Sequence, residues 1–153
     1  MAFLILGLGG REMHNQTEAG LPQMNEKLIY NFEEGLPGFA HCKRFVLAEE
    51  EANKPFGTLK CLDSEETSFV IVDPFFFFKE YEFELPEHAI KELQLVSSQS
   101  LIIRVIVTWR GSLSSATVNL VAPVILNANV GLGKQIILSN TSYTARHRLF
   151  EPR

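Results

Sequence analysis

The stretch FVIVDPFFFFKEYEFELP, from Phe69 to Pro86, decides the fold because it joins an apolar run, a proline and four consecutive phenylalanines. Successive side chains of a strand point to opposite faces, so a strand over Phe75 to Phe78 would place two rings on each face. The protein must then bury both faces or leave one for a partner. Since proline cannot donate a hydrogen bond to a ladder, we expect the core strand over Phe69 to Val72 to end at Pro74.

The second half of this stretch alternates acidic and apolar residues. Glu80, Glu82 and Glu84 fall on one face of an extended segment, so that face is predicted to be acidic and solvated. Burial of one Phe contributes ~1.5–3 kcal/mol, so the core needs some of the rings. Aromatic side chains rimmed by carboxylates are also typical of a hot spot for a basic protein. The candidate contact residues are Asp73, Phe75, Phe76, Phe77, Glu80, Tyr81, Glu82 and Glu84.

The composition indicates one soluble globular domain that is rich in β structure. The 153 residues are 46% hydrophobic and 21% charged, and they include 12 Phe, which suits pleated, half-buried surfaces. Apolar and alternating runs predict strands at residues 13–20, 27–32, 43–48, 56–62, 68–73, 101–109, 116–122, 123–127 and 134–138. The run at 101–109 is long and β-branched, as in a central strand. Many short strands and one helix predict a sandwich or a barrel.

That helix is expected to begin at Pro86 and to end before Ser97. Proline is pre-organised for the first helical position, and the next residue, Glu87, suits the positive end of the helix dipole. A buried stripe is predicted from the spacing of Ala89, Ile90 and Leu93. The strand residues expected in the core are Val70, Val72, Ile102, Val105, Val107, Val118, Leu120, Ile125 and Ile137.

Three polar features have a structural and a functional interpretation. Asn119 and Gln135 lie inside apolar strands, where we expect them to satisfy buried backbone groups; the alternative is that they make contacts at a strand edge. The charged connection Glu49 to Lys54 is expected to be a solvated loop. The basic tail contributes Arg146 and His147 as candidate contacts; the alternative is that these residues belong to a solvated terminus without a partner.

Charge is distributed unevenly along the chain. Residues 1–100 carry a net charge of −9 and residues 101–153 a net charge of +5, which together give −4. An acidic surface disfavours binding to a phosphate backbone, so no direct nucleic-acid partner is expected. It favours a basic protein partner, because complementary charge raises the rate of association.

The motifs of catalysis and metal binding are absent from the sequence. It contains no GxGxxG, HExxH or GxSxG pattern, so neither an enzyme, a cofactor nor a metal site is expected. Cys42 and Cys61 lack the spacing of a zinc site or a disulfide framework, which indicates a reducing, cytoplasmic compartment. No apolar run approaches the roughly 20 residues of a membrane span. The apolar residues Ala2 to Leu6 follow no Lys or Arg, so an extension upstream of a domain that begins near Met13 is favoured over a signal peptide.

Several blocks together resemble a known family. They are EGLPGF (34–39), Pro55 with Phe56, FVIVDP (69–74), Tyr81 with Glu82, VNLVAPVILN (118–127), KQIIL (134–138), and Tyr143 with Arg146 and His147. In order and spacing, these blocks resemble the flagellar assembly factor FliW family from about Met13 to Leu149. The resemblance implies a compact β-barrel-like domain. We therefore expect a mainly β, antiparallel and partly open barrel over residues 13–149, with one short helix near 86–95, an N-terminal extension at 1–12 and a C-terminal tail at 150–153.

The resemblance also implies a function. Members of this family are cytoplasmic, non-enzymatic proteins that bind flagellin before export and bind CsrA, a small basic RNA-binding regulator whose repression of flagellin synthesis they relieve. The hypothesis that follows places CsrA on Asp73, Glu80, Glu82 and Glu84 with one or two exposed rings. Flagellin could lie in a groove or add to a strand edge, and a monomer is expected. A β-barrel module that binds an unrelated small ligand or hydrophobic peptide is the alternative.

Overall fold

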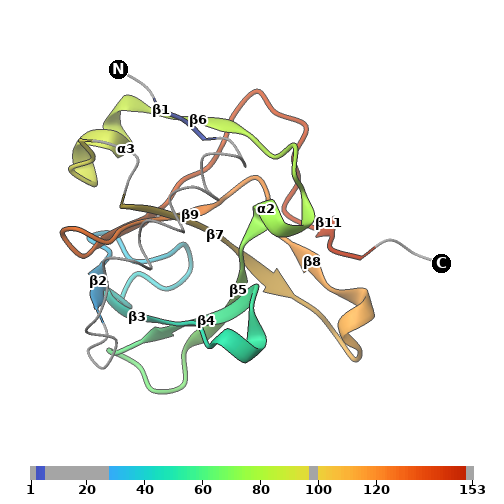
Figure 1. The fold of residues 1–153 in the computed structure, drawn as a ribbon. Helices are drawn as coiled ribbons and strands as arrows, with labels where there is room; N and C mark the ends of the chain where they lie inside the picture. Colours follow the sequence, from blue (N-terminus) through green and yellow to red (C-terminus); the bar gives the residue numbers. More distant parts are fainter. Residues whose placement is uncertain (1–2, 6–27, 97–99, 151–153) are drawn as a thin grey trace.

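Seven strands form a closed barrel in the computed structural model, which describes residues 3–5, 28–96 and 100–150 (Figure 1). Around the ring they are β7 (Leu101–Thr108), β5 (Ser68–Val72), β4 (Phe56–Cys61), β3 (Arg44–Ala48), β2 (Ile29–Asn31), β10 (Leu132–Gln135) and β9 (Val124–Asn127). The predicted barrel class is confirmed. The predicted strand at 13–20 lies outside the described residues.

Shorter elements lie around the barrel. They are β1 (Phe3–Ile5), β6 (Phe83–Leu85), β8 (Thr117–Val118), β11 (His147–Arg148), α2 (Pro74–Phe77), α3 (Glu87–Glu92) and the 3₁₀ turns η1 (Glu51–Asn53) and η2 (Leu113–Ser115). β6 pairs with β1 in a separate two-stranded sheet, and β11 pairs with β8. In Figure 1, α3 and β6 lie above the barrel, and α2 lies in front of β7.

The length of β7 closes the barrel, which was expected to be partly open. Its first half, Leu101 to Arg104, pairs with β9, and its end pairs with β8 on the same side. Its other side pairs with β5. The barrel was also expected to be antiparallel, but β10 pairs with β2 in parallel at Leu132 and Asn31.

β7 separates two hydrophobic cores, which confirms its prediction as the central strand. Its odd-numbered residues, such as Ile103 and Val105, belong to one core with Tyr81, Leu85 and other residues of the segment that covers this side of the barrel. Its even-numbered residues Ile102 and Ile106 pack on the other core, to which the remaining strands of the ring contribute. The second core fills the barrel with Tyr30, Phe32, Leu36, Cys42, Phe45, Leu59, Cys61, Ile71, Val124 and Leu126.

Most of the predicted core residues are buried, and one prediction is wrong. Val72, Val105, Val107, Val118, Leu120 and Ile125 are buried, whereas Val70 and Ile102 are half-buried against a core. Ile137 is 71% exposed, and its neighbour Ile136 is buried in its place. The physical reason is alternation: Ile136 donates its N–H to Pro123 O at 3.1 Å just beyond β10, which turns the next side chain outward.

The predicted helix is present, one residue later than expected. Pro86 is the N-cap of α3, and the last helical residue is Glu92. Ala89 and Leu93 are buried and Ile90 is half-buried, which confirms the predicted stripe. The stripe packs on the core outside the barrel wall and fixes α3 over β7 and β9.

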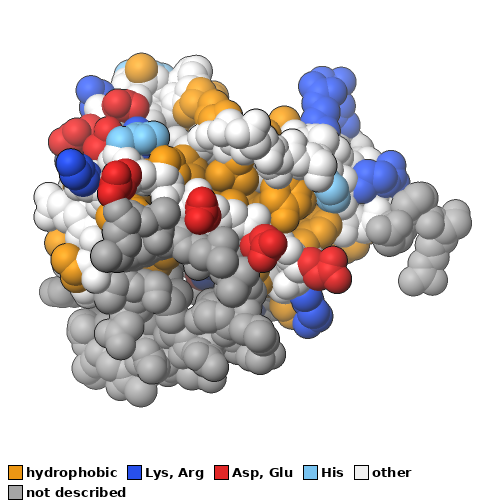
Figure 2. All heavy atoms as spheres, turned by 90° about the horizontal axis from the view of Figure 1, so that it is seen from above, with side chains coloured by type: hydrophobic (Ala, Val, Ile, Leu, Met, Phe, Trp, Pro, Cys, Tyr) orange, Lys and Arg blue, Asp and Glu red, His pale blue; other side chains and the backbone are white. Residues whose placement is uncertain are grey.

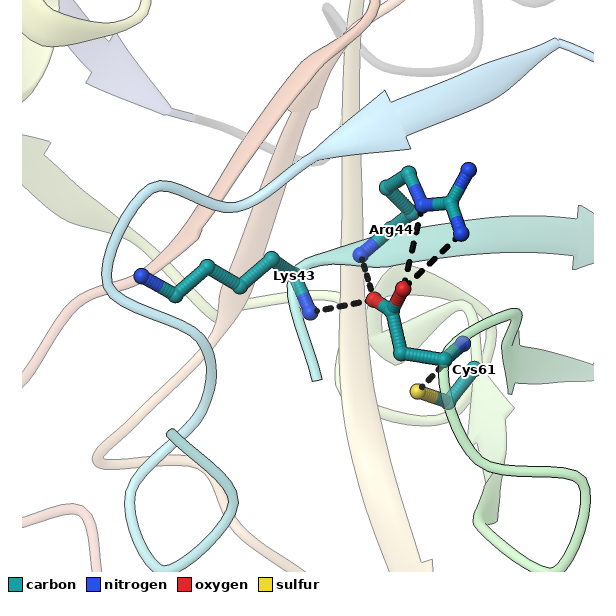
Figure 3. A network of polar contacts seen from close by, with 4 residues as sticks. Lys43, Arg44 and Cys61 are labelled. Atoms are coloured by element: carbon teal, nitrogen blue, oxygen red, sulfur yellow. Dashed lines mark hydrogen bonds and ion pairs between the residues drawn. The ribbon is translucent and has the colours of Figure 1, made fainter. Parts of the chain in front are cut away.

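Polar contacts tie the loops to the barrel. Gln135 donates to Ala122 O at 2.9 Å, as predicted, whereas among the described residues no donor reaches the buried Oδ1 of Asn119. Asp63 accepts the N–H groups of Lys43 and Arg44 and pairs with the Arg44 guanidinium at 2.9 Å (Figure 3). This carboxylate joins the start of β3 to the loop after β4.

Glu49 departs from its predicted role in a solvated loop. Its side chain is 17% exposed and forms a two-pronged ion pair with Arg104 of β7, with Oε1 3.0 Å from Nη2. The carboxylate reaches Arg104 across Gly57 of β4, where a Cβ would lie 2.5 Å from Glu49 Cγ. The glycine therefore makes room for a half-buried ion pair, while Glu50 to Lys54 remain exposed.

Candidate partner-binding face

The four phenylalanines begin as a helical turn, so they are not distributed two to a face. Asp73 is the N-cap of α2, and its Oδ1 accepts the N–H of Phe75 at 3.0 Å. Pro74 occupies the first helical position, and Phe78 N–H donates to Pro74 O at 2.8 Å. An Asp-Pro pair suits both needs of a helix start, an acceptor for a free N–H and a fixed φ.

One of the four rings is exposed. Phe76 is 61% exposed and meets Phe77 edge to face at 5.1 Å between ring centroids. Phe77 is half-buried, 5.9 Å from the Phe56 ring and 5.7 Å from the Phe150 ring. Phe75 is half-buried too, 5.7 Å from Tyr81. The exposed Phe76 ring therefore packs on Phe77, which is itself packed against Phe56 and Phe150.

Tyr81 is a core residue, which contradicts its prediction as a surface contact. The side chain is 1% exposed, and its hydroxyl donates to Leu120 O at 2.7 Å. Burial raises the pKa of Tyr81 well above its ordinary value. The physical reason is alternation, which puts Tyr81 on the same side of the segment as the buried Phe83 and Leu85.

Three carboxylates of the predicted acidic stripe are exposed, and the fourth is not part of it. Glu80, Glu82 and Glu84 are exposed, and the residues between them are buried. Figure 2 shows a row of acidic side chains beside hydrophobic ones on the face above β6 and α3. Asp73 is only half-exposed and caps α2, so its carboxylate is already engaged.

The C-terminal segment lies against the same region, which brings the predicted basic residues close to it. The His147 ring meets the Phe78 ring edge to face at 5.2 Å. Tyr143 accepts the N–H of Glu82 at 3.1 Å and packs its ring on Tyr81 at 4.8 Å. Arg146 is exposed. The acidic aromatic face is defined here as Phe76, Phe77, Glu80, Glu82, Glu84, Arg146 and His147.

Sequence reasoning missed the aromatic residues that support this face. Phe56, Phe150 and Tyr143 come from three distant segments, and each packs on a ring between Phe75 and Tyr81. The arginines of the tail indicate a basic segment, and the signal for its packing role is the pair of aromatic residues Tyr143 and Phe150.

This face offers an exposed aromatic ring, that of Phe76, and the exposed carboxylates of Glu80, Glu82 and Glu84. Among the described residues, no group of three or more His, Cys, Asp or Glu is placed to hold a metal ion. Within the same part of the chain, no helix has the length and apolar character needed to cross a membrane.

Comparisons with known proteins decide the family. The family model described as FliW protein matches residues 13–149, which include the whole barrel and the acidic aromatic face. The chain belongs to the FliW family. The flagellar assembly factor FliW of Geobacillus kaustophilus is 41% identical to it over 128 residues, which cover 84% of this chain and 88% of the relative. The flagellar assembly factor FliW of Clostridium kluyveri is 36% identical over 137 residues, covering 90% of this chain and 94% of the relative.

The fold agrees with this assignment. A crystal structure of the flagellar assembly factor FliW superimposes with a TM-score of 0.77 at 38% identity, and covers 82% of this chain and 87% of that one. β1 lies upstream of the residues that the FliW family model matches.

Proposed function

We propose that this chain is a non-catalytic, cytoplasmic flagellar assembly factor that binds flagellin and CsrA, and that it relieves the repression of flagellin synthesis by CsrA. Membership of the FliW family and the name that its relatives share support the role in flagellar assembly. The two partners follow from the family resemblance, and the acidic aromatic face supplies a surface suited to one of them.

The single observation that carries the placement of CsrA is that Phe76 is exposed in the same segment of the chain as the exposed Glu80, Glu82 and Glu84. An aromatic side chain that buries on binding supplies affinity, and carboxylates around it steer a basic protein toward the site. Phe76 rests on Phe77, so little conformational entropy is lost when a partner covers it. CsrA, as a basic protein, has the complementary charge.

For flagellin, the candidate contact is the segment around Arg146 and His147. β11 is the last strand of its sheet, and among the described strands only β8 pairs with it. An extended peptide could therefore add to its free edge, where main-chain hydrogen bonds supply affinity. Proximity of this segment to Phe78 means that the two partners would meet neighbouring surfaces.

Charge reversal tests the CsrA placement. Glu80→Lys with Glu82→Lys should slow association with CsrA by about tenfold at low salt, and by less at high salt, because salt screens exposed charges. Stopped-flow fluorescence measures the association rate. The matched control is Glu65→Lys with Glu66→Lys, an exposed pair in the loop before β5. An unchanged rate at low salt, with the circular dichroism spectrum intact, would contradict the placement.

Two further measurements separate the alternatives. In the first, purified flagellin is titrated into a preformed complex of this protein with CsrA. Displacement of CsrA is expected if both partners bind the acidic aromatic face. If purified chain binds neither protein but retains a small molecule, the barrel is a binding module of another kind.

A further inference from the structure

A groove lies between the turn after β2, α3 and β10. Its volume is about 510 Å³, and Glu33 and Pro37 line it from the turn, Glu92 from α3 and Lys134 from β10. Among the described residues that line it, none belongs to the acidic aromatic face. It is therefore a separate feature of the surface.

Lys134 links the two walls of this groove. Its Nζ lies 3.1 Å from Glu34 Oε1 on the turn and 2.9 Å from Glu92 Oε1 on α3. The side chain is 16% exposed. Burial by itself lowers the pKa of Lys134, but hydrogen bonds to Glu92 and Glu34 outweigh it and raise the pKa above its ordinary value. The ammonium group is thus charged at neutral pH and already neutralised by two carboxylates.

The lining remains acidic after this pairing. Glu33, Glu34 and Glu92 contribute three carboxylates against the one ammonium of Lys134, so the charge of the described lining is −2 with His neutral. Glu33 is exposed, and Lys134 pairs with Glu34 and Glu92 but not with Glu33. An acidic lining disfavours phosphate and carboxylate ligands and favours a cation.

Apolar side chains supply the other half of the surface. Ile137 lines the groove and is 71% exposed, and Pro37, Pro86 and Leu132 line it too. Scattered exposed apolar residues are ordinary, but an exposed isoleucine in a concave surface offers area that a partner can bury. Covering one such side chain contributes about 1.5–3 kcal/mol before the cost of association.

We propose that this groove docks a basic amphipathic segment of a partner protein. An apolar side chain of the segment packs on Ile137 and Pro37, and a Lys or Arg one helical turn away pairs with Glu33. The proposal does not depend on the function proposed above, because none of its residues lies on the acidic aromatic face.

NMR mapping tests the location directly. The probe is a synthetic peptide of about 14 residues, roughly four helical turns, with Leu on one face and Lys on the other. Added to ¹⁵N-labelled protein, it should shift the amide signals of residues 33–37, 86–93 and 132–137. Shifts centred on residues 75–84, or no shifts at all, would overturn the proposal.

Variants test the chemistry. Ile137→Ser and Glu33→Lys should each weaken binding of the peptide about tenfold, whereas the control Glu65→Lys should change it less than about twofold. All three positions are exposed, so folding should be retained. A matched peptide with Glu in place of Lys should not bind measurably. Equal binding of the two peptides would indicate a purely apolar ligand site and overturn the basic partner, as would an unaltered affinity of Glu33→Lys.

Discussion

Asp63 is a residue whose ionisation fastens one loop to the barrel. The Lys43 N–H, and then the Arg44 guanidinium, hold the pKa of the Asp63 carboxyl below its ordinary value of 3.8. A pKa that is lowered on folding stabilises the folded state at any pH above the unfolded value, and this contribution is lost as the pH falls through the folded value.

Replacement of Asp63 should therefore have an effect that depends on pH. Asp63→Asn should lower the free energy of unfolding by a constant amount from about pH 5 to 8, and the difference from the wild type should shrink below about pH 4. Urea unfolding at a series of pH values measures it. Glu65→Gln, in the same exposed loop, is the control and should show no such gap. A gap that persists unchanged at low pH would mean that the charge of Asp63 is not what stabilises the loop.

At the scale of the element, a capping residue and a proline decide the structure of α2, although its aromatic composition favours a strand. Four consecutive aromatic residues favour a strand, yet Asp73 and Pro74 start a helical turn there. The cap and the ring contacts then orient Phe76 outward. The exposed anchor of the acidic aromatic face thus depends on a capping residue that does not itself need to touch a partner.

Removal of this cap should be measurable in both stability and binding. Asp73→Ala should lower the free energy of unfolding by about 1 kcal/mol, because it leaves the Phe75 N–H without its acceptor. Asp73→Asn keeps an acceptor and should lose much less. Denaturant unfolding monitored by circular dichroism distinguishes the two variants. An equal loss in both would show that the carboxylate acts through its charge, which also raises the pKa of Arg104, and not as a cap.

At the scale of the whole molecule, the closed barrel sequesters its interior. Both cysteines are free and buried inside it, with Cys42 at 0% and Cys61 at 2% exposure. Burial and the neighbouring Cys61 thiol raise the pKa of Cys42 to about 11. At pH 8 almost all of the Cys42 side chain is therefore protonated, and the thiolate that reacts with disulfide reagents is scarce.

Thiol reactivity should report opening of the barrel. In native conditions at pH 8, both thiols should resist 5,5′-dithiobis(2-nitrobenzoic acid), and in guanidinium chloride both should react at once. Reaction rates at intermediate denaturant should follow the unfolding rate, because exposure requires strands of the ring to separate. Absorbance at 412 nm (roughly the thionitrobenzoate maximum) follows the reaction. Rapid labelling of either thiol in the folded protein would mean that the ring opens locally.

The sequence by itself determined the local features of this protein. Alternation predicted the exposed acidic side formed by Glu80, Glu82 and Glu84, proline and spacing predicted α3, and the long apolar run predicted β7 as the central strand. These features depend on neighbours along the chain, where the periods of strand and helix act directly. Several blocks in order also indicated the family.

Only the tertiary structure decided what distant segments do to one another. Closure of the barrel depends on β7 pairing with β9, the burial of Glu49 depends on Arg104, and the inward turn of Ile136 depends on Pro123. The Asp73 cap is local to Phe76. The Phe77 ring on which Phe76 packs, however, is in contact with Phe150 from the other end of the chain. Such pairs carry no periodic signal, because the contact is made between residues whose separation in sequence is arbitrary.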